Sequence, residues 1–136
     1  MPVCRWLPRT VESPTTDEAH PAIDRYVASL EPPGRRVAPG EWGISVEVED
    51  WPLHIGLRVQ HGVLLAQAMA VGPGRLEAQT LLRANRRLDL VSFGLTESGE
   101  VWVKGAAPVE GLDAGELDRL LALVVRSAGW ARTQAR

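Results

Sequence analysis

The chain of 136 residues contains one cysteine, Cys4, so it cannot form an internal disulfide. It also lacks an apolar run of the roughly 18 residues that a membrane helix needs, and its first residues lack the long apolar core of a secretory signal. These absences predict a soluble protein of the reducing cytoplasm that makes no contact with a membrane.

Neither sign of charge is in large excess: 15 Lys and Arg residues stand against 17 Asp and Glu residues. Because a nucleic-acid-binding domain usually carries a clear positive excess, nucleic acid is not expected as a partner. The three histidines, His20, His54 and His61, fall on three different predicted elements, so we expect neither a metal site nor any other cofactor.

The length of the chain suits one domain, which we divide into three regions. Residues 1–15 contain three prolines and no periodicity, which is typical of a flexible N-terminal arm. Residues 16–131 are predicted to form the single domain, and residues 132–136 a basic C-terminal tail. The first helix of the domain is expected near Pro21, with Ile23 and Val27 on its apolar face.

Strict alternation of apolar and polar residues then predicts three strands, in "WGISVEVEDW", "LHIGLRVQ" and "VLLAQAMA". A two-residue turn at His61-Gly62 would pair Val59 with Leu64. A two-residue link at Trp51-Pro52 would pair Val48 with Ile55, Val46 with Leu57 and Ile44 with Val59, and would place His54 opposite Glu49.

The second half of the chain predicts a helix over about 75–88, a pair of strands and a final helix. A loop at Glu97-Ser98-Gly99 would pair Phe93 with Val103 and place Trp102 opposite Gly94. Asp113 and Glu116 form the capping box that starts the last helix. The order α-β-β-β-α-β-β-α predicts an α+β fold, an antiparallel sheet with its helices packed on one face.

The stretch "LLRANRRLDLVSFGLTESGEVWVKGAAPVEGLDAGELDRLLALVV" resembles the C-terminal half of the YbjN-like family. The fold of that family is similar to the small dimeric chaperones of type III secretion, and the resemblance extends over about residues 17–130, in the N-terminal half mainly by element order. It implies a homodimer that binds segments of other proteins. The family brings no catalytic residue with it, so we do not expect an enzyme.

One strip of side chains suggests where such a partner would bind. Val63, Leu65 and Met69 are predicted on the outer face of the third strand, where a free sheet would carry polar residues. Trp51 and Trp102 are expected at a turn and on the same outer face, and exposed tryptophans often anchor protein contacts. We therefore predict a protein- or peptide-binding, chaperone-like or adaptor domain with an unidentified client, whose strip serves as dimer seam or client site.

Two other functions stay open at this point. A nucleic-acid-associated regulatory factor would use Arg83, Arg86 and Arg87 with the basic tail, and would stack bases on tryptophan rings. The same arginines also suit the C-terminal end of an ordinary helix, where cations face the negative end of the dipole. A small-ligand sensory domain would instead use a pocket between a helix and the sheet.

Overall fold

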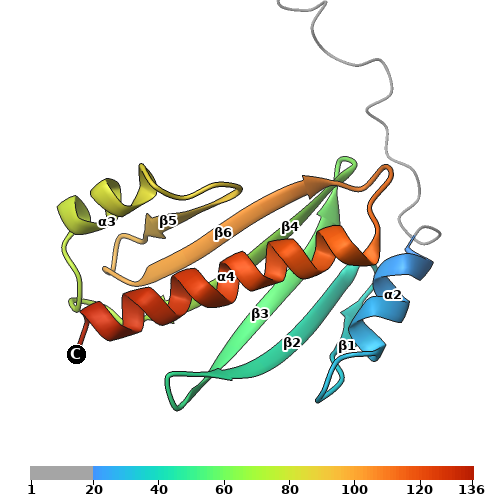
Figure 1. Cartoon of the computed structure of the whole chain (residues 1–136), viewed down its shortest axis with the longest axis horizontal. Coiled ribbons are helices and arrows are strands. Elements are labelled where there is room, and N and C mark those ends of the chain that lie inside the picture. The colour runs from blue at the N-terminus through green and yellow to red at the C-terminus, as the bar shows by residue number, and fades with distance from the viewer. Residues whose placement is uncertain (1–19) are drawn as a thin grey trace, which may run out of the picture.

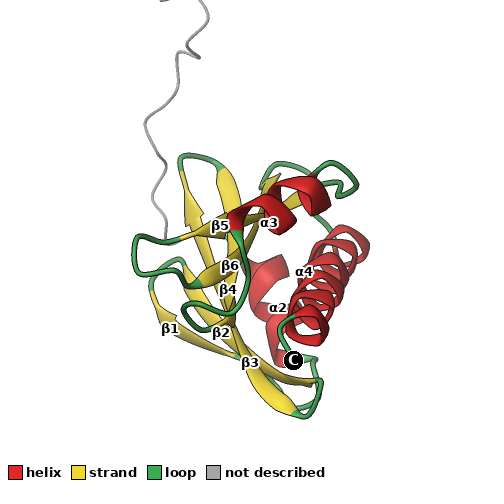
Figure 2. Ribbon diagram, turned by 90° about the vertical axis from the view of Figure 1, so that its left-hand side faces the viewer, coloured by secondary structure: helices red, strands yellow, loops and turns green. Residues whose placement is uncertain are grey.

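The computed structural model describes residues 20–136, which form a six-stranded antiparallel sheet in the order β1-β2-β3-β4-β6-β5. Three helices pack on one face of this sheet, and α4 runs diagonally across it (Figures 1 and 2). The elements are α2 (Pro21–Ala28), β1 (Arg35–Ala38), β2 (Glu41–Val48), β3 (Trp51–Gln60), β4 (Val63–Val71), α3 (Ala78–Asn85), β5 (Val91–Leu95), β6 (Val101–Pro108) and α4 (Ala114–Gln134).

The predicted α+β class and the placement of the helices are confirmed, with one strand more than expected. The additional strand is β1, which forms in the segment after Pro32-Pro33-Gly34 and pairs with the start of β2. The arm predicted over residues 1–15 lies outside the described residues.

The core lies between α4 and the central strands β4 and β6. The apolar face of α4 is buried there through Leu117, Leu120, Leu121, Val124 and Ala128. Burying one such leucine or valine stabilises a fold by roughly 1.5–3 kcal/mol. The N-cap half of the predicted capping box is present, because Asp113 Oδ1 accepts a hydrogen bond from the Glu116 backbone N–H at 2.8 Å.

Two of the three predicted hairpin registers are confirmed, and the third is wrong. Val59 pairs with Leu64 across His61-Gly62, and Phe93 pairs with Val103. In the β2–β3 hairpin, however, the turn lies at Glu49-Asp50, and both residues have positive φ (53° and 70°). A proline ring holds φ near −65°, so Pro52 cannot occupy a turn of that type.

The corrected turn pairs Ile44 with Ile55 in place of Val59, and Val46 with Leu53 in place of Leu57. The register therefore moves by an even number of residues, which leaves Leu53, Ile55 and Leu57 of β3 on the core face. His54 lies opposite Ser45, not Glu49, and its Nδ1 is 2.8 Å from the Ser45 hydroxyl.

The helices differ from the prediction at their ends. α3 is shorter than expected, and it packs mainly on β5 at the margin of the sheet, where its Leu82 is 66% exposed. α4 is longer than expected and continues to Gln134. Residues 132–134, predicted as part of a basic tail, are thus helical.

Candidate functional site: an outer sheet face and an arginine-lined cleft

Four of the five predicted contact residues lie together on the face of the sheet opposite the helices. Val63, Leu65 and Met69 alternate along β4 with the buried Leu64, Ala66 and Ala68. Val63 and Leu65 are half-buried and Met69 is 41% exposed. Across the β4–β6 ladder Met69 pairs directly with Trp102.

Apolar partners continue this surface, since Leu65 pairs with Ala106 and Val63 with Pro108. We call the set Val63, Leu65, Met69 and Trp102 the outer strip.

Trp102 borders a hollow at one end of the outer strip. Its indole N–H donates to Glu100 Oε1 at 3.1 Å, which holds the edge of the ring. Trp102 lies opposite Gly94, as predicted, but a Cβ on Gly94 would have no atom within 4 Å. The ring therefore leaves the glycine open, and a hollow of about 350 Å³ remains between Gly94, Trp102 and Lys104.

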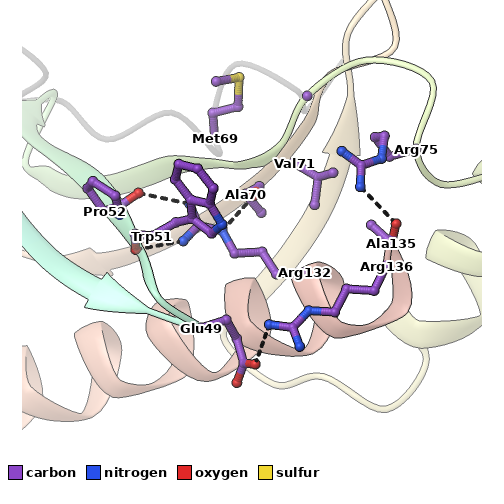
Figure 3. Close-up of a pocket in the computed structure, with 11 residues that line it drawn as sticks. Glu49, Trp51, Pro52, Met69, Ala70, Val71, Arg75, Arg132, Ala135 and Arg136 are labelled. Carbon is purple, nitrogen blue, oxygen red and sulfur yellow. Dashed lines mark hydrogen bonds and ion pairs between the residues drawn. The ribbon is translucent and has the colours of Figure 1, made fainter.

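Trp51 lies apart from the outer strip, at the β2–β3 hairpin, and is 68% exposed. It lines a cleft of about 310 Å³ between this hairpin, the end of β4 and the last turn of α4 (Figure 3). Met69 lines the same cleft, so it belongs to both the outer strip and the cleft. The remaining lining includes Arg75, Arg132 and Arg136.

Arg132 holds the cleft together through four hydrogen bonds to backbone carbonyls, and Figure 3 draws those to Ala70, Trp51 and Pro52. Its Nε donates to Ala70 O at 2.9 Å, and its Nη1 donates to Val48 O at 2.9 Å and Trp51 O at 3.0 Å. Its Nη2 donates to Pro52 O at 3.0 Å. Burial lowers the pKa of Arg132, but an arginine still stays charged at neutral pH.

The β4 strand supplies one of these carbonyls because its ladder is irregular. The register with β6 shifts between Met69 and Val71, which places Ala70 in a bulge. A bulged residue is left out of regular pairing, so its carbonyl needs another donor. Arg132 falls within the predicted basic tail, so this role was not predicted from the sequence. The available signal was its spacing, four residues after Ala128 on the buried face of α4.

The other two arginines of the cleft have weaker partners. Arg75 Nη2 donates to Ala135 O at 3.0 Å, and Arg136 contacts Glu49 at 3.2 Å in an exposed ion pair. The side chains that line the cleft thus include three guanidinium groups and one carboxylate, that of Glu49. The cleft suits a partner that carries an anionic group beside an apolar side chain.

A family model described as "Putative bacterial sensory transduction regulator", the YbjN model, matches residues 55–129, which is more than half of the chain. The chain belongs to the YbjN family. A comparison with curated proteins found no match.

Solved structures similar to this YbjN protein include chains from three protein complexes. A chain of the HopA1-SchA chaperone-effector complex has a TM-score of 0.63 and 21% identity, over 84% of this chain and 90% of that chain. A chain of the ExsC-ExsE complex has a TM-score of 0.63 and 20% identity, over 83% and 93%.

A third, from the heterodimeric ExoU-SpcU complex of the type III secretion system of Pseudomonas aeruginosa, has a TM-score of 0.61 and 14% identity, over 84% and 98%. At sequence identities of 14–21%, these similarities show a shared fold alone. They confirm the predicted similarity of the fold to type III secretion chaperones.

The two free margins of the YbjN sheet differ. Asn85 of α3 hydrogen-bonds the backbone of Phe93 on the edge strand β5. On the opposite margin β1 pairs only with the start of β2, so residues 44–48 have no strand beside them on that side within residues 20–136. A groove of about 490 Å³ follows this open edge, and Gly43 and Gly56, paired across β2 and β3, line it.

The remaining candidate groups stay dispersed. Arg83, Arg86 and Arg87 are exposed at and just beyond the end of α3, which is the arrangement expected of an ordinary helix terminus. Within the described part of this YbjN protein, no three His, Cys, Asp or Glu residues gather as metal ligands. None of its described helices is both long and apolar enough to cross a membrane.

Proposed function

We propose that this YbjN protein is a non-enzymatic, chaperone-like domain of the cytoplasm that acts as a homodimer and binds an extended segment of another protein. The observation that carries this proposal is the outer strip, a row of apolar side chains on the sheet face opposite the helices. Apolar residues on the outer face of a central strand usually mark an interaction surface. The HopA1-SchA structure, a chaperone-effector complex on the same fold, supports a protein client.

Two kinds of contact would hold the client. Its apolar side chains would be buried against Val63, Leu65 and Met69, with Trp51 and Trp102 as anchors near Met69. Burial of apolar surface gives roughly 25 cal/mol per Å², and the buried core of an interface supplies most of its affinity.

Its backbone would pair with the open edge of β2 at residues 44–47, since the Val48 carbonyl already accepts from Arg132. An added strand gains main-chain hydrogen bonds, while alternate side chains provide specificity. The β5 margin is less suitable for strand addition, because the Asn85 amide already occupies the backbone of Phe93.

The homodimer would use a different region. Leu82 on α3, Leu90 just before β5 and Leu95 at the end of β5 are exposed apolar side chains along the same margin of the sheet. Such residues rarely face water together in a stable monomer. We propose that they form the dimer seam, which leaves the outer strip free for the client.

The test compares two variants of β4. Leu65→Asp introduces a charge in the middle of the outer strip, while Gln67→Asp introduces the same charge at the next outward position, which is already polar and exposed. Wild-type and variant proteins are used to retain partners from the native cell, and a synthetic segment of the retained partner is then titrated by calorimetry.

We expect Leu65→Asp to lose the segment and Gln67→Asp to keep it, with unchanged circular dichroism for both. Equal binding of the segment by both variants would contradict the role of the outer strip. Leu82→Glu is expected to halve the mass measured by light scattering, and an unchanged mass would contradict the seam.

A further inference from the structure

Another cavity lies on the helix-bearing side, away from the outer strip. It has a volume of about 300 Å³ and is bordered by α3, β5 and α4. Phe93 and Trp130 line it with their rings, whose centroids are 5.6 Å apart at an interplanar angle of 39°. Ala84 and Leu88 line it from α3 and the turn that follows, so the interior is mainly hydrocarbon.

Two arginine side chains lie beside this apolar cavity. Arg87 and Arg126 line it, and both residues are exposed. A long cationic side chain can lay its hydrocarbon stem along apolar surface while its charged group stays in water. Among residues 20–136 neither arginine has a carboxylate within 4 Å. Ser127, only 4% exposed, adds a hydroxyl to the lining.

We propose that this cavity binds a small carboxylic acid with a hydrocarbon body, such as a medium-chain fatty acid. The hydrocarbon would lie against Phe93 and Trp130, and the carboxylate would pair with Arg87 and Arg126. Guanidinium groups bind carboxylates through paired, charge-assisted hydrogen bonds. Ligand sites span roughly 300–1,000 Å³, so a cavity of about 300 Å³ suits a small molecule and excludes a dinucleotide-sized one.

This site does not depend on the proposed client surface, because it shares no residue with the outer strip or with the open edge of β2. On α3, Leu82 and Ala84 are two positions apart and therefore point in different directions. A change at the proposed dimer seam is thus separable from a change in the cavity.

The experiment is a calorimetric titration of the full chain with decanoate below its aggregation concentration, with neutral decan-1-ol as the comparison. We expect one decanoate per chain. Arg87→Gln and Arg126→Gln should each weaken decanoate binding about tenfold, the effect of losing one charge-assisted hydrogen bond, and leave the binding of decan-1-ol unchanged. Arg119→Gln serves as the matched control, because Arg119 is exposed on α4, like Arg126, but lies outside the cavity.

Ala84→Leu, which fills the cavity, should abolish binding of both molecules. No decanoate binding by the wild type, equal affinity in Arg119→Gln and Arg126→Gln, or saturation at many molecules per chain would overturn the proposal.

The seam variant Leu82→Glu separates this proposal from that of the dimer. We expect the monomeric variant to bind decanoate with wild-type affinity. If decanoate binds only that variant and not the wild-type dimer, a second copy of the chain fills the cavity and the proposal is overturned. A failure of Leu65→Asp to affect the client would leave these outcomes untouched.

Discussion

The side-chain amide of Asn85 hydrogen-bonds both backbone groups of Phe93. The Phe93 N–H donates to Asn85 Oδ1 at 2.7 Å, and Asn85 Nδ2 donates to Phe93 O at 3.2 Å. Because β5 is the last strand of the sheet, this amide takes the place of a neighbouring strand. Unpaired edges are templates for aggregation, so Asn85 both stabilises the strand and closes the edge.

Replacing Asn85 with Leu should therefore affect stability and association together. We expect the free energy of unfolding to fall by about 1–2 kcal/mol, since two backbone groups lose their partner. The unpaired edge of β5 should also promote aggregation, which would raise the light scattering as the protein is concentrated. Gln79→Leu, which removes an exposed amide from the same helix, is the control in urea denaturation. Equal stability of the two variants would show that the amide does not support β5.

Arg132→Lys keeps the positive charge of the cleft but removes the planar fork that reaches four carbonyls. We expect a loss of about 2–3 kcal/mol in urea denaturation, and faster amide exchange in the β2–β3 turn. Arg119→Lys, an exposed exchange on the same helix, should change stability by less than about 0.5 kcal/mol. If both variants unfold at the same urea concentration, the four contacts contribute little.

Tyr26 makes the free energy of unfolding depend on pH in the alkaline range. Its hydroxyl donates to Asp118 Oδ1 at 2.6 Å, and burial, followed by this hydrogen bond and the charge of Asp118, raises the pKa of Tyr26 above its ordinary 10.0. The unfolded chain loses the phenolic proton above about pH 10 while the folded chain keeps it. The stabilisation is therefore complete below about pH 10 and is lost as the pH rises further.

Tyr26→Phe should cost about 1 kcal/mol at pH 7, and the difference from the wild type should shrink above about pH 10. Urea denaturation at a series of pH values measures this difference. Because the chain has one tyrosine, its phenolate absorbance also reports the folded-state titration directly. A titration midpoint near 10 in the folded protein would rule out the raised pKa.

Two glycines of the β5–β6 hairpin should respond differently to alanine. A Cβ on Gly105 would lie 2.8 Å from Val91 Cγ1 and 2.9 Å from Leu120 Cδ1, whereas a Cβ on Gly94 would have no atom within 4 Å. We expect overpacking in Gly105→Ala to lower the free energy of unfolding by about 1–3 kcal/mol, and the melting temperature to fall with it. Gly94→Ala should leave the melting temperature nearly unchanged. Similar melting temperatures would mean that α4 can move away from β6 at no cost.

The alternation of apolar residues predicted which side chains enter the core, even where the hairpin was misplaced. Ile44 and Ile55 are both buried, although the predicted partner of Ile44 was Val59. A strand face depends only on whether a residue number is odd or even, so an even shift of register leaves it unchanged. The turn itself depends on which residues accept positive φ, and Glu49 and Asp50 carry a weaker signal for that than glycine does.

The sequence by itself determined the order of the elements apart from β1, the buried face of α4 and the outward position of Val63, Leu65 and Met69, because these follow from local periodicity and capping. Only the tertiary structure decided the partners of Arg132, the closure of β5 by Asn85 and the cavity beside Trp130. These features join backbone carbonyls and side chains from segments far apart in the chain, such as Ala70 with Arg132. A local pattern cannot encode which distant carbonyl a bulge will leave free.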